Sequence, residues 1–230
     1  GIRDRCMMDG GERTRLTEGL RAQHPDLAPD GRRLVFTSNS AATTHLMIAD
    51  LQDVQASARV LLRSRRYEQV FTPRWSPDGT TIAISRWRAP GFRDVVLVDA
   101  QSGDVRAVTD DRALDTGPAW SPDGRTLYFS SDRTGIANLF AYDMETGATH
   151  QVTNSLSGAY APTVNPNGRE LVYLGYTSHG FDLFRLPLDR STWRDAPLYE
   201  NNRPPAVEPG ESALLSSRYR PARTVYPRSY

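Results

Sequence analysis

Short apolar runs alternate with polar turn segments along most of the chain, and the pattern repeats at a nearly constant interval. A proline, an Asp or Asn and a glycine recur roughly 45 residues apart, as Pro29-Asp30-Gly31, Pro77-Asp78-Gly79, Pro122-Asp123-Gly124 and Pro166-Asn167-Gly168. Proline sets φ for a turn, the Asp or Asn side chain bonds back to the backbone, and glycine accepts a positive φ. We therefore expect four structural turns of one type.

Each turn is flanked by runs typical of strands. Apolar and aromatic runs follow the turns at residues 34–36, 82–84, 127–129 and 171–173, and again at 46–48, 95–98, 138–140 and 182–184. An Asp closes each second run, at Asp50, Asp99, Asp143 and Asp189, and short runs end in Val-Thr at 108–109 and 152–153. Each unit thus predicts four short strands, which is the make-up of a propeller blade.

These motifs resemble the TolB-like β-propeller repeat, a relative of the WD repeat, whose signature is close to P-x-W-S-P-D-G-x-x-[LI]-x-[FY]-x-S. Segments 73–79 and 118–124 match it, whereas Leu27 and Val164 stand in place of the Trp. The expected fold is all-β: a β-propeller of four-stranded antiparallel blades, with four complete repeats plus a partial or composite blade. The expected units are residues 1–20 (partial), 21–66, 67–111, 112–155 and 156–200.

The two ends of the chain leave two readings open. Residues 1–17 look like the back half of a blade, and the Pro/Arg-rich tail 201–230 keeps the four-residue proline spacing at Pro205 and Pro209. The tail is therefore either a linker or a degenerate front half that completes a closing blade with the N-terminus. Because the chain opens in mid-pattern and without Met, we expect it to be a portion of a longer product.

Composition narrows the classes of partner. The formal net charge is +1, which argues against a nucleic-acid partner. All 28 basic residues are Arg. No run of 18 apolar residues occurs, so we expect no membrane insertion by this segment. Cys6 is the single cysteine, which excludes a disulfide within the chain.

Motifs that carry chemistry are missing from the sequence. It has no Gly-x-Ser-x-Gly elbow, P-loop or Gly-x-Gly-x-x-Gly, and its four histidines show no metal-ligand spacing. We therefore expect no catalysis, cofactor or metal. The turn residues Asp30, Asp78 and Asp123 are interpreted as structural, Asp132 and Arg133 as an ion pair within one hairpin loop, and Trp75 and Trp120 as structural core.

The loops at the opposite end of the strands from the Pro-Asp-Gly turns vary in length and chemistry, as a recognition surface does. Arg and aromatic residues, which are enriched at binding hot spots, gather there. The candidate partner-binding rim comprises Arg66, Tyr67, Arg86, Arg88, Arg93, Arg112, Arg133, Tyr160 and His179. The competing interpretation is an ordinary solvated surface of an Arg-rich protein.

The resemblance implies a non-catalytic interaction or scaffold propeller of the gram-negative cell envelope, in the periplasm or associated with the outer membrane, that binds a protein or peptide. The alternative is an accessory, substrate-gating propeller domain of a larger peptidase. A third hypothesis is binding of a small ligand or sugar in the central channel. The sequence flanking this segment would discriminate the first two.

Overall fold

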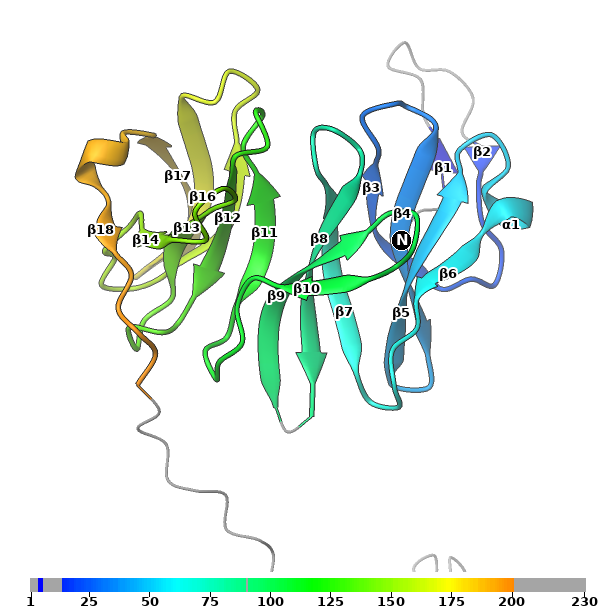
Figure 1. The fold of residues 1–230 in the computed structure, drawn as a ribbon, viewed down its shortest axis with the longest axis horizontal. Coiled ribbons are helices and arrows are strands. Elements are labelled where there is room, and N and C mark those ends of the chain that lie inside the picture. The colour runs from blue at the N-terminus through cyan, green and yellow to red at the C-terminus, as the bar shows by residue number, and fades with distance from the viewer. Residues whose placement is uncertain (1–3, 6–13, 90, 201–230) are drawn as a thin grey trace, which may run out of the picture. The chain divides into compact units, whose positions relative to one another are not determined.

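A computed structural model describes residues 4–5, 14–89 and 91–200. The described chain is built almost entirely of antiparallel strands, which follow one another as separate sheets along the sequence (Figure 1). Only two short helical segments interrupt them, α1 (Val54–Ser57) and the 3₁₀ turn η1 (Arg190–Thr192). In this part of the chain, neither has the length or the apolar run needed to cross a bilayer. The expected all-β propeller fold is confirmed.

Blades 1 and 2 each form a four-stranded antiparallel sheet in chain order. Blade 1 consists of β3 (Ala22–Leu27), β4 (Arg33–Ser40), β5 (Thr43–Asp50) and β6 (Arg59–Leu62). Blade 2 consists of β7 (Gln69–Trp75), β8 (Thr81–Arg88), β9 (Phe92–Asp99) and β10 (Val105–Ala107).

Blades 3 and 4 depart from the expected four strands each. Blade 3 contains β11 (Thr116–Trp120), β12 (Thr126–Ser131), β13 (Asn138–Asp143) and β14 (Thr149–Gln151), and blade 4 contains β15 (Ala159–Val164), β16 (Glu170–Thr177) and β17 (Gly180–Pro187). The next strand, β18 (Arg194–Asp195), does not pair with β17. It pairs with β14, so blade 3 has five strands and blade 4 three among the described residues.

The N-terminal unit contributes a short two-stranded ladder, β1 (Asp4–Arg5) with β2 (Thr14–Arg15). Leu16 and Leu20, which follow β2, pack against the apolar cluster on the outer face of blade 1, around Phe36 and Met47. The expected back half of a blade thus has a paired ladder. The tail 201–230, and with it the hypothesis of a composite closing blade, lies outside the described residues.

The four Pro-Asp-Gly turns have the same geometry. In each, the glycine N–H donates to the carbonyl three residues earlier, over 2.8–2.9 Å. The side chains of Asp30, Asp78, Asp123 and Asn167 each accept from the amide two residues on. The glycines have φ between 68° and 71°, which is the left-handed region that a Cβ disfavours.

The proline four residues before each turn marks an irregularity in the first strand of the blade. The residue before it has a positive φ in all four blades, at His24, Thr72, Gly117 and Ala161. The pairing register shifts at the same places, as in a β-bulge. The bulged first strands of successive blades contact one another in chain order, which is the radial array of a propeller.

The hydrophobic core lies between the blades. Along β8, Ile82 and Ile84 pack toward blade 1, while Ala83 packs toward Leu127 and Phe129 of blade 3. A third cluster joins blade 3 to blade 4 through Tyr128 and Leu171. Because each middle sheet is covered on both faces, its strands are continuous apolar runs rather than alternating ones.

Candidate functional site

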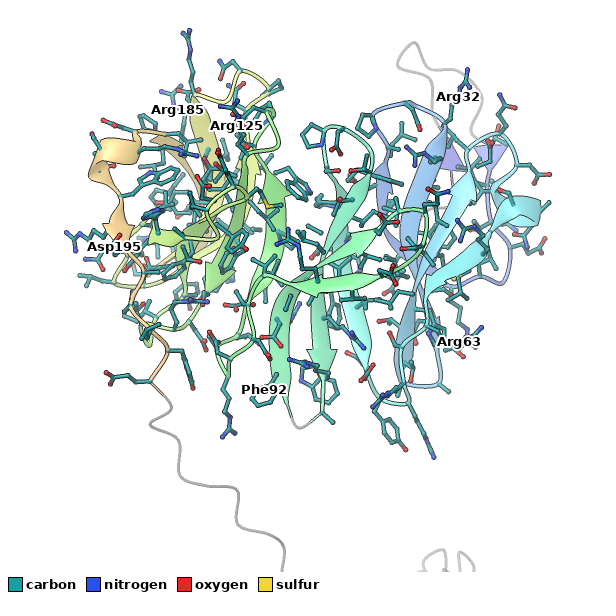
Figure 2. All side chains as sticks on the ribbon, viewed as in Figure 1. Arg32, Arg63, Phe92, Arg125, Arg185 and Asp195 are labelled. Carbon is teal, nitrogen blue, oxygen red and sulfur yellow. The ribbon has the colours of Figure 1, made fainter. Side chains whose placement is uncertain are left out.

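The chain offers a candidate binding surface at the ends of the blades opposite the Pro-Asp-Gly turns. We call it the loop rim: the β4–β5, β8–β9, β12–β13 and β16–β17 loops with the segments that join successive blades. In Figure 2, Arg32 and Arg125, which follow Pro-Asp-Gly turns, lie at one end of the sheets, whereas Arg63 and Phe92 lie at the other. The nine residues predicted for recognition lie in the loop rim or in the strand ends beside it. The structure divides eight of them into two groups, and the ninth, Tyr160, lines a groove.

The first group is exposed. Arg66, Tyr67 and His179 are open to solvent, and the Arg66 guanidinium lies 4.7 Å from the centre of the Tyr67 ring. Arg112 is half-buried, with its guanidinium 5.9 Å from the Phe92 ring. These cations rest on aromatic faces at the surface, where a partner can reach them.

The second group is committed to contacts within the protein. Arg86 donates to Glu68 over 3.0 Å, in a pair that is mostly withdrawn from solvent. Burial alone would raise the pKa of Glu68, but hydrogen bonds from the Arg65 amide and from Arg86 hold that pKa below its usual range. Arg93 donates to Ser85 over 3.0 Å and covers the Phe71 ring at 4.4 Å.

Arg133 belongs to a buried ionic network, where the sequence predicted a pair with the adjacent Asp132. The structure places its guanidinium beside Asp111 and Asp115, at 3.6 and 3.4 Å. The side chain of Arg133 is only 8% exposed and that of Asp115 is fully buried. Burial raises the pKa of Asp115 to about 6, against the opposing charge of Arg133. Arg133 therefore joins blades rather than facing a partner.

Arg88 has a similar role one loop earlier. Its guanidinium contacts the buried carboxylate of Asp94 at 3.3 Å and also contacts Asp110. Asp94 in turn accepts a hydrogen bond from the Asp111 amide, over 3.2 Å. Burial raises the pKa of Asp94 above its usual value, because the hydrogen bond and the Arg88 charge offset it only in part. Cations that the sequence assigned to recognition thus stabilise the junction of blades 2 and 3.

Between these charges and blade 4, the loop rim is hollowed by a groove of about 610 Å³. Its apolar lining includes Leu114, Ile136 and Leu156, all exposed, together with Tyr160, and Arg93 forms part of the wall. Leu156 is 90% exposed. Polar side chains, among them Thr116, Ser130 and Asp132, share the lining. The volume of the groove is within the range of binding sites, and its mixed lining offers both apolar contacts and hydrogen bonds to a partner.

Exposed aromatic side chains continue the groove onto blade 4. Tyr160 contacts Phe181 edge to face with ring centres 5.8 Å apart, and Phe181 contacts Tyr176 at 5.1 Å. Both Phe181 and Tyr176 are exposed. Groove and aromatic cluster together form a contiguous apolar surface, a feature that marks interaction sites on soluble proteins.

Sequence reasoning found Arg93 and Tyr160 but missed the aliphatic part of the groove. Leu114, Ile136 and Leu156 stand alone in polar loops, outside any periodic run. The sequence does show them as large apolar side chains at loop positions. A single exposed Leu is ordinary, however, and only the folded chain brings the three together.

The arrangement supports binding. Among residues 14–89 and 91–200, no group of three or more His, Cys, Asp or Glu side chains is placed to hold a metal ion. Asp115, the carboxyl group whose pKa is raised to about 6, pairs with the buried Arg133 and does not line the groove.

Comparison with known proteins places the chain in a family. The family model "TolB beta propeller domain" matches residues 9–226. A TolB homolog from Chlorobium luteolum is 33% identical over 148 residues, covering 63% of this chain and 32% of that protein. The Tol-Pal system protein TolB of Bordetella pertussis is 26% identical over 159 residues, covering 50% and 35%. The matched region thus spans about a third of the length of these relatives.

Solved structures show the same architecture. TolB from Acinetobacter baumannii superposes with a TM-score of 0.72 at 19% identity, covering 84% of this chain and 47% of that one. A puromycin hydrolase superposes with a TM-score of 0.64 at 20% identity, covering 80% and 30%. At these identities the likeness shows the fold alone, whereas the family match extends over nearly the whole sequence. The chain belongs to the TolB beta propeller domain family.

Proposed function

We propose that this chain is a non-catalytic interaction propeller of the bacterial cell envelope that binds a protein or peptide partner on its loop rim. The observation that carries the proposal is the groove lined by Leu114, Ile136, Leu156 and Tyr160, with exposed aromatics beside it. Interface cores are depleted of charge and enriched in aromatic side chains. A partner segment with one large apolar side chain would fill the groove, and Arg66 and Arg112 would contact its polar flanks.

The relatives support the proposed compartment and class of partner. One is a TolB homolog and another is a Tol-Pal system protein, which supports an envelope role and a protein partner. A rigid array of sheets that presents loops suits a scaffold, because the fold supplies a stable support and the loops supply the contacts. The periplasm, or association with the outer membrane, is the location we propose on the same ground.

An accessory role beside a peptidase is the second candidate. A puromycin hydrolase shares the fold, but at an identity that carries no activity over. A peptidase signature in the sequence flanking this segment would favour that role, and its absence there would favour the interaction propeller.

The test uses the chain itself and a displayed peptide library. Peptides selected on the wild type are measured for affinity against Leu156→Arg. The matched control is Leu198→Arg, because Leu198 is also 90% exposed but does not line the groove. We expect Leu156→Arg to weaken binding at least about tenfold, or 1.4 kcal/mol, and Leu198→Arg to leave it unchanged. Selected peptides that bind Leu156→Arg as tightly as the wild type would refute the groove as the binding site.

A further inference from the structure

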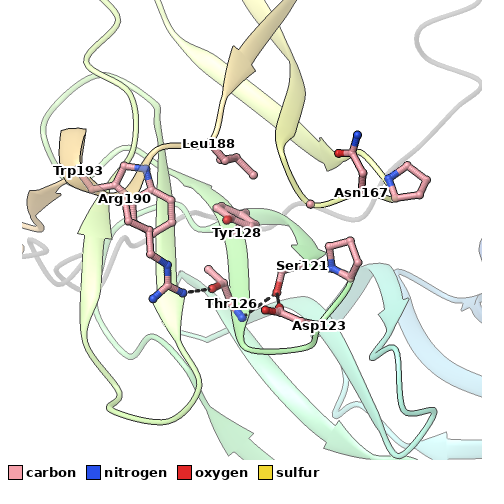
Figure 3. A pocket seen from close by; sticks show the side chains of 11 residues that line it. Ser121, Asp123, Thr126, Tyr128, Asn167, Leu188, Arg190 and Trp193 are labelled. Atoms are coloured by element: carbon pink, nitrogen blue, oxygen red, sulfur yellow. Dashed lines mark hydrogen bonds between the residues drawn. The ribbon is translucent and has the colours of Figure 1, made fainter.

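A second cavity lies at the opposite end of the blades from the loop rim. It has a volume of about 380 Å³ and opens between the Pro-Asp-Gly turn of blade 3 and the Pro-Asn-Gly turn of blade 4. Figure 3 shows Ser121, Asp123 and Tyr128 on one side of it, Asn167 on another, and Leu188, Arg190 and Trp193 closing it. We call it the turn pocket.

The chain after β17 builds the closing wall. Asp189 caps η1 by accepting from the Ser191 amide over 2.9 Å, and β18 then pairs with β14 of blade 3. Arg190 donates to Thr126 over 2.6 Å and contacts Asp143 at 3.3 Å. Trp193 is held edge to face against Tyr128, with ring centres 6.0 Å apart. The wall is therefore fixed to blade 3 by bonds at several points, so the pocket is preformed.

The corresponding place between blades 1 and 2 is filled. There Arg33, the fourth residue after the turn proline, donates to the Gly79 carbonyl over 2.9 Å and covers the Trp75 ring at 4.7 Å. In blade 3 the same position of the motif is Thr126. A small side chain at this position leaves open the space that Arg33 occupies at the junction of blades 1 and 2.

Polar groups with unused hydrogen-bonding capacity line the turn pocket. Asp123 uses Oδ1 for the Ser121 hydroxyl and the Arg125 amide, and no residue that the structure describes forms a hydrogen bond with its Oδ2. Asn167 uses Oδ1 for the Arg169 amide, which leaves the two N–H donors of its Nδ2. The hydrogen bond from Ser121 holds the pKa of Asp123 below its usual value, so its carboxylate is charged. Tyr128, only 4% exposed, brings its hydroxyl to the cavity.

The charges at the mouth select against an anionic ligand. The Arg190 guanidinium contacts Asp143 at 3.3 Å, so these two charges offset each other, and the Asp123 carboxylate that lines the pocket would repel an anion. Aromatic faces suit the C–H groups of a sugar ring, and a carboxylate beside an amide suits neighbouring hydroxyls as acceptor and donor. We propose that the turn pocket binds one ring of a neutral saccharide. This site is separate from the groove on the loop rim.

The experiment is ligand-observed NMR with calorimetry on the whole chain. The probes are the methyl glycosides of glucose, galactose, mannose and N-acetylglucosamine, with glucuronic acid and glucosamine as charged comparators. We expect saturable binding of at least one neutral glycoside, and weaker binding of glucuronic acid, whose carboxylate would face that of Asp123. A neutral series that never saturates, or tighter binding of glucuronic acid or glucosamine than of every neutral glycoside, would overturn the proposal.

Two variants locate the binding site. Asp123→Asn keeps the turn acceptor, as Asn167 does in blade 4, but replaces the free carboxylate oxygen with a donor; Trp193→Leu removes the aromatic face. Each should weaken binding about tenfold or more, the loss expected for a hydrogen bond to a charged group or for an aromatic contact. Asp78→Asn is the matched control, because it occupies the same motif position in blade 2, outside the pocket. Unchanged affinity in Asp123→Asn and Trp193→Leu would place any binding elsewhere.

Discussion

The indole Nε1 of Trp120 donates to the backbone carbonyl of Arg74 over 3.1 Å, from the first strand of blade 3 to the first strand of blade 2. One junction earlier, the Asp26 carboxylate of blade 1 accepts from the Trp75 amide over 2.7 Å. Bonds between side chain and backbone therefore tie neighbouring first strands together, at the place where a sheet ladder cannot form. These hydrogen bonds connect the separate sheets of successive blades into a single array.

We expect Trp120→Phe to lower the free energy of unfolding by about 1–2 kcal/mol, because the Arg74 carbonyl loses its donor while most of the apolar contact remains. Trp120→Ala should cost about 3 kcal/mol, the lower end for loss of a large aromatic side chain, since Trp120 is only partly buried. Urea titration monitored by circular dichroism measures both. Asp123→Ala is the comparison and should cost about 1 kcal/mol. A larger loss for Asp123→Ala than for Trp120→Ala would contradict these placements.

The buried carboxyl of Asp115 should make stability depend on pH in the direction opposite to an ordinary salt bridge. Its pKa rises from an ordinary value of 3.8 to about 6 in the folded chain. Between pH 4 and 6 the folded state therefore holds a proton that the unfolded state has released, and this stabilising contribution is lost as the pH rises.

The measurement is the free energy of unfolding at a series of pH values for the wild type and for Asp115→Asn. The difference, wild type minus variant, should fall by about 2 kcal/mol between pH 4 and 7 and then stay level. Subtracting the variant removes the opposite contribution of the turn carboxylates Asp78 and Asp123, whose pKa values are lowered. A difference that is constant with pH, or that rises, would show that Asp115 is ionised throughout.

Gly103 should be a more sensitive position than Gly31, although both have a positive φ. A Cβ on Gly31 would meet open space, whereas a Cβ on Gly103 would lie 2.5 Å from the Leu61 carbonyl oxygen of blade 1. Gly31→Ala should cost about 1–2 kcal/mol for the backbone conformation alone. Gly103→Ala should cost a further 1–3 kcal/mol or so, because two backbones must separate. Equal losses in thermal or urea unfolding would mean that the blades do not approach there.

The parts of the fold that local chemistry dictates could be predicted from the sequence. The turn at Pro122-Asp123-Gly124 and the apolar runs beside it depend on residues within a few positions of one another. The return of β18 to β14 could not be predicted, because Arg194 and Asp195 have no apolar pattern and pair over a long sequence separation. The same holds for the groove, where three isolated loop residues become neighbours only after folding.

The partners of the charged side chains were equally beyond prediction from the sequence wherever they lie far apart in it. An Arg in a loop next to an Asp gives no sign of whether its partner is that Asp or a carboxylate two segments away. Arg133 pairs with Asp115 because the segment before β11 lies against the β12–β13 loop, where the Leu114 amide also donates to Asp132, and Asp115 is fully buried there. Composition could identify the residue type suited to such a site, but not which Arg would fill it.

Substitution by Met should therefore lower the stability of the fold at Arg133 but not at Arg66. Arg133→Met removes the cation beside the buried Asp115 and leaves that carboxyl without its charge partner, a loss of about 3–5 kcal/mol near neutral pH. Arg66→Met alters an exposed side chain and should change stability by less than about 0.5 kcal/mol. Urea unfolding at pH 7.5 separates the two. At pH 5, where the Asp115 carboxyl is largely protonated, the loss in Arg133→Met should shrink. For peptide binding on the loop rim, Arg66→Met should weaken affinity while leaving the fold intact. An Arg133→Met protein as stable as the wild type at pH 7.5 would mean that the ionic network does not hold blades 2 and 3 together.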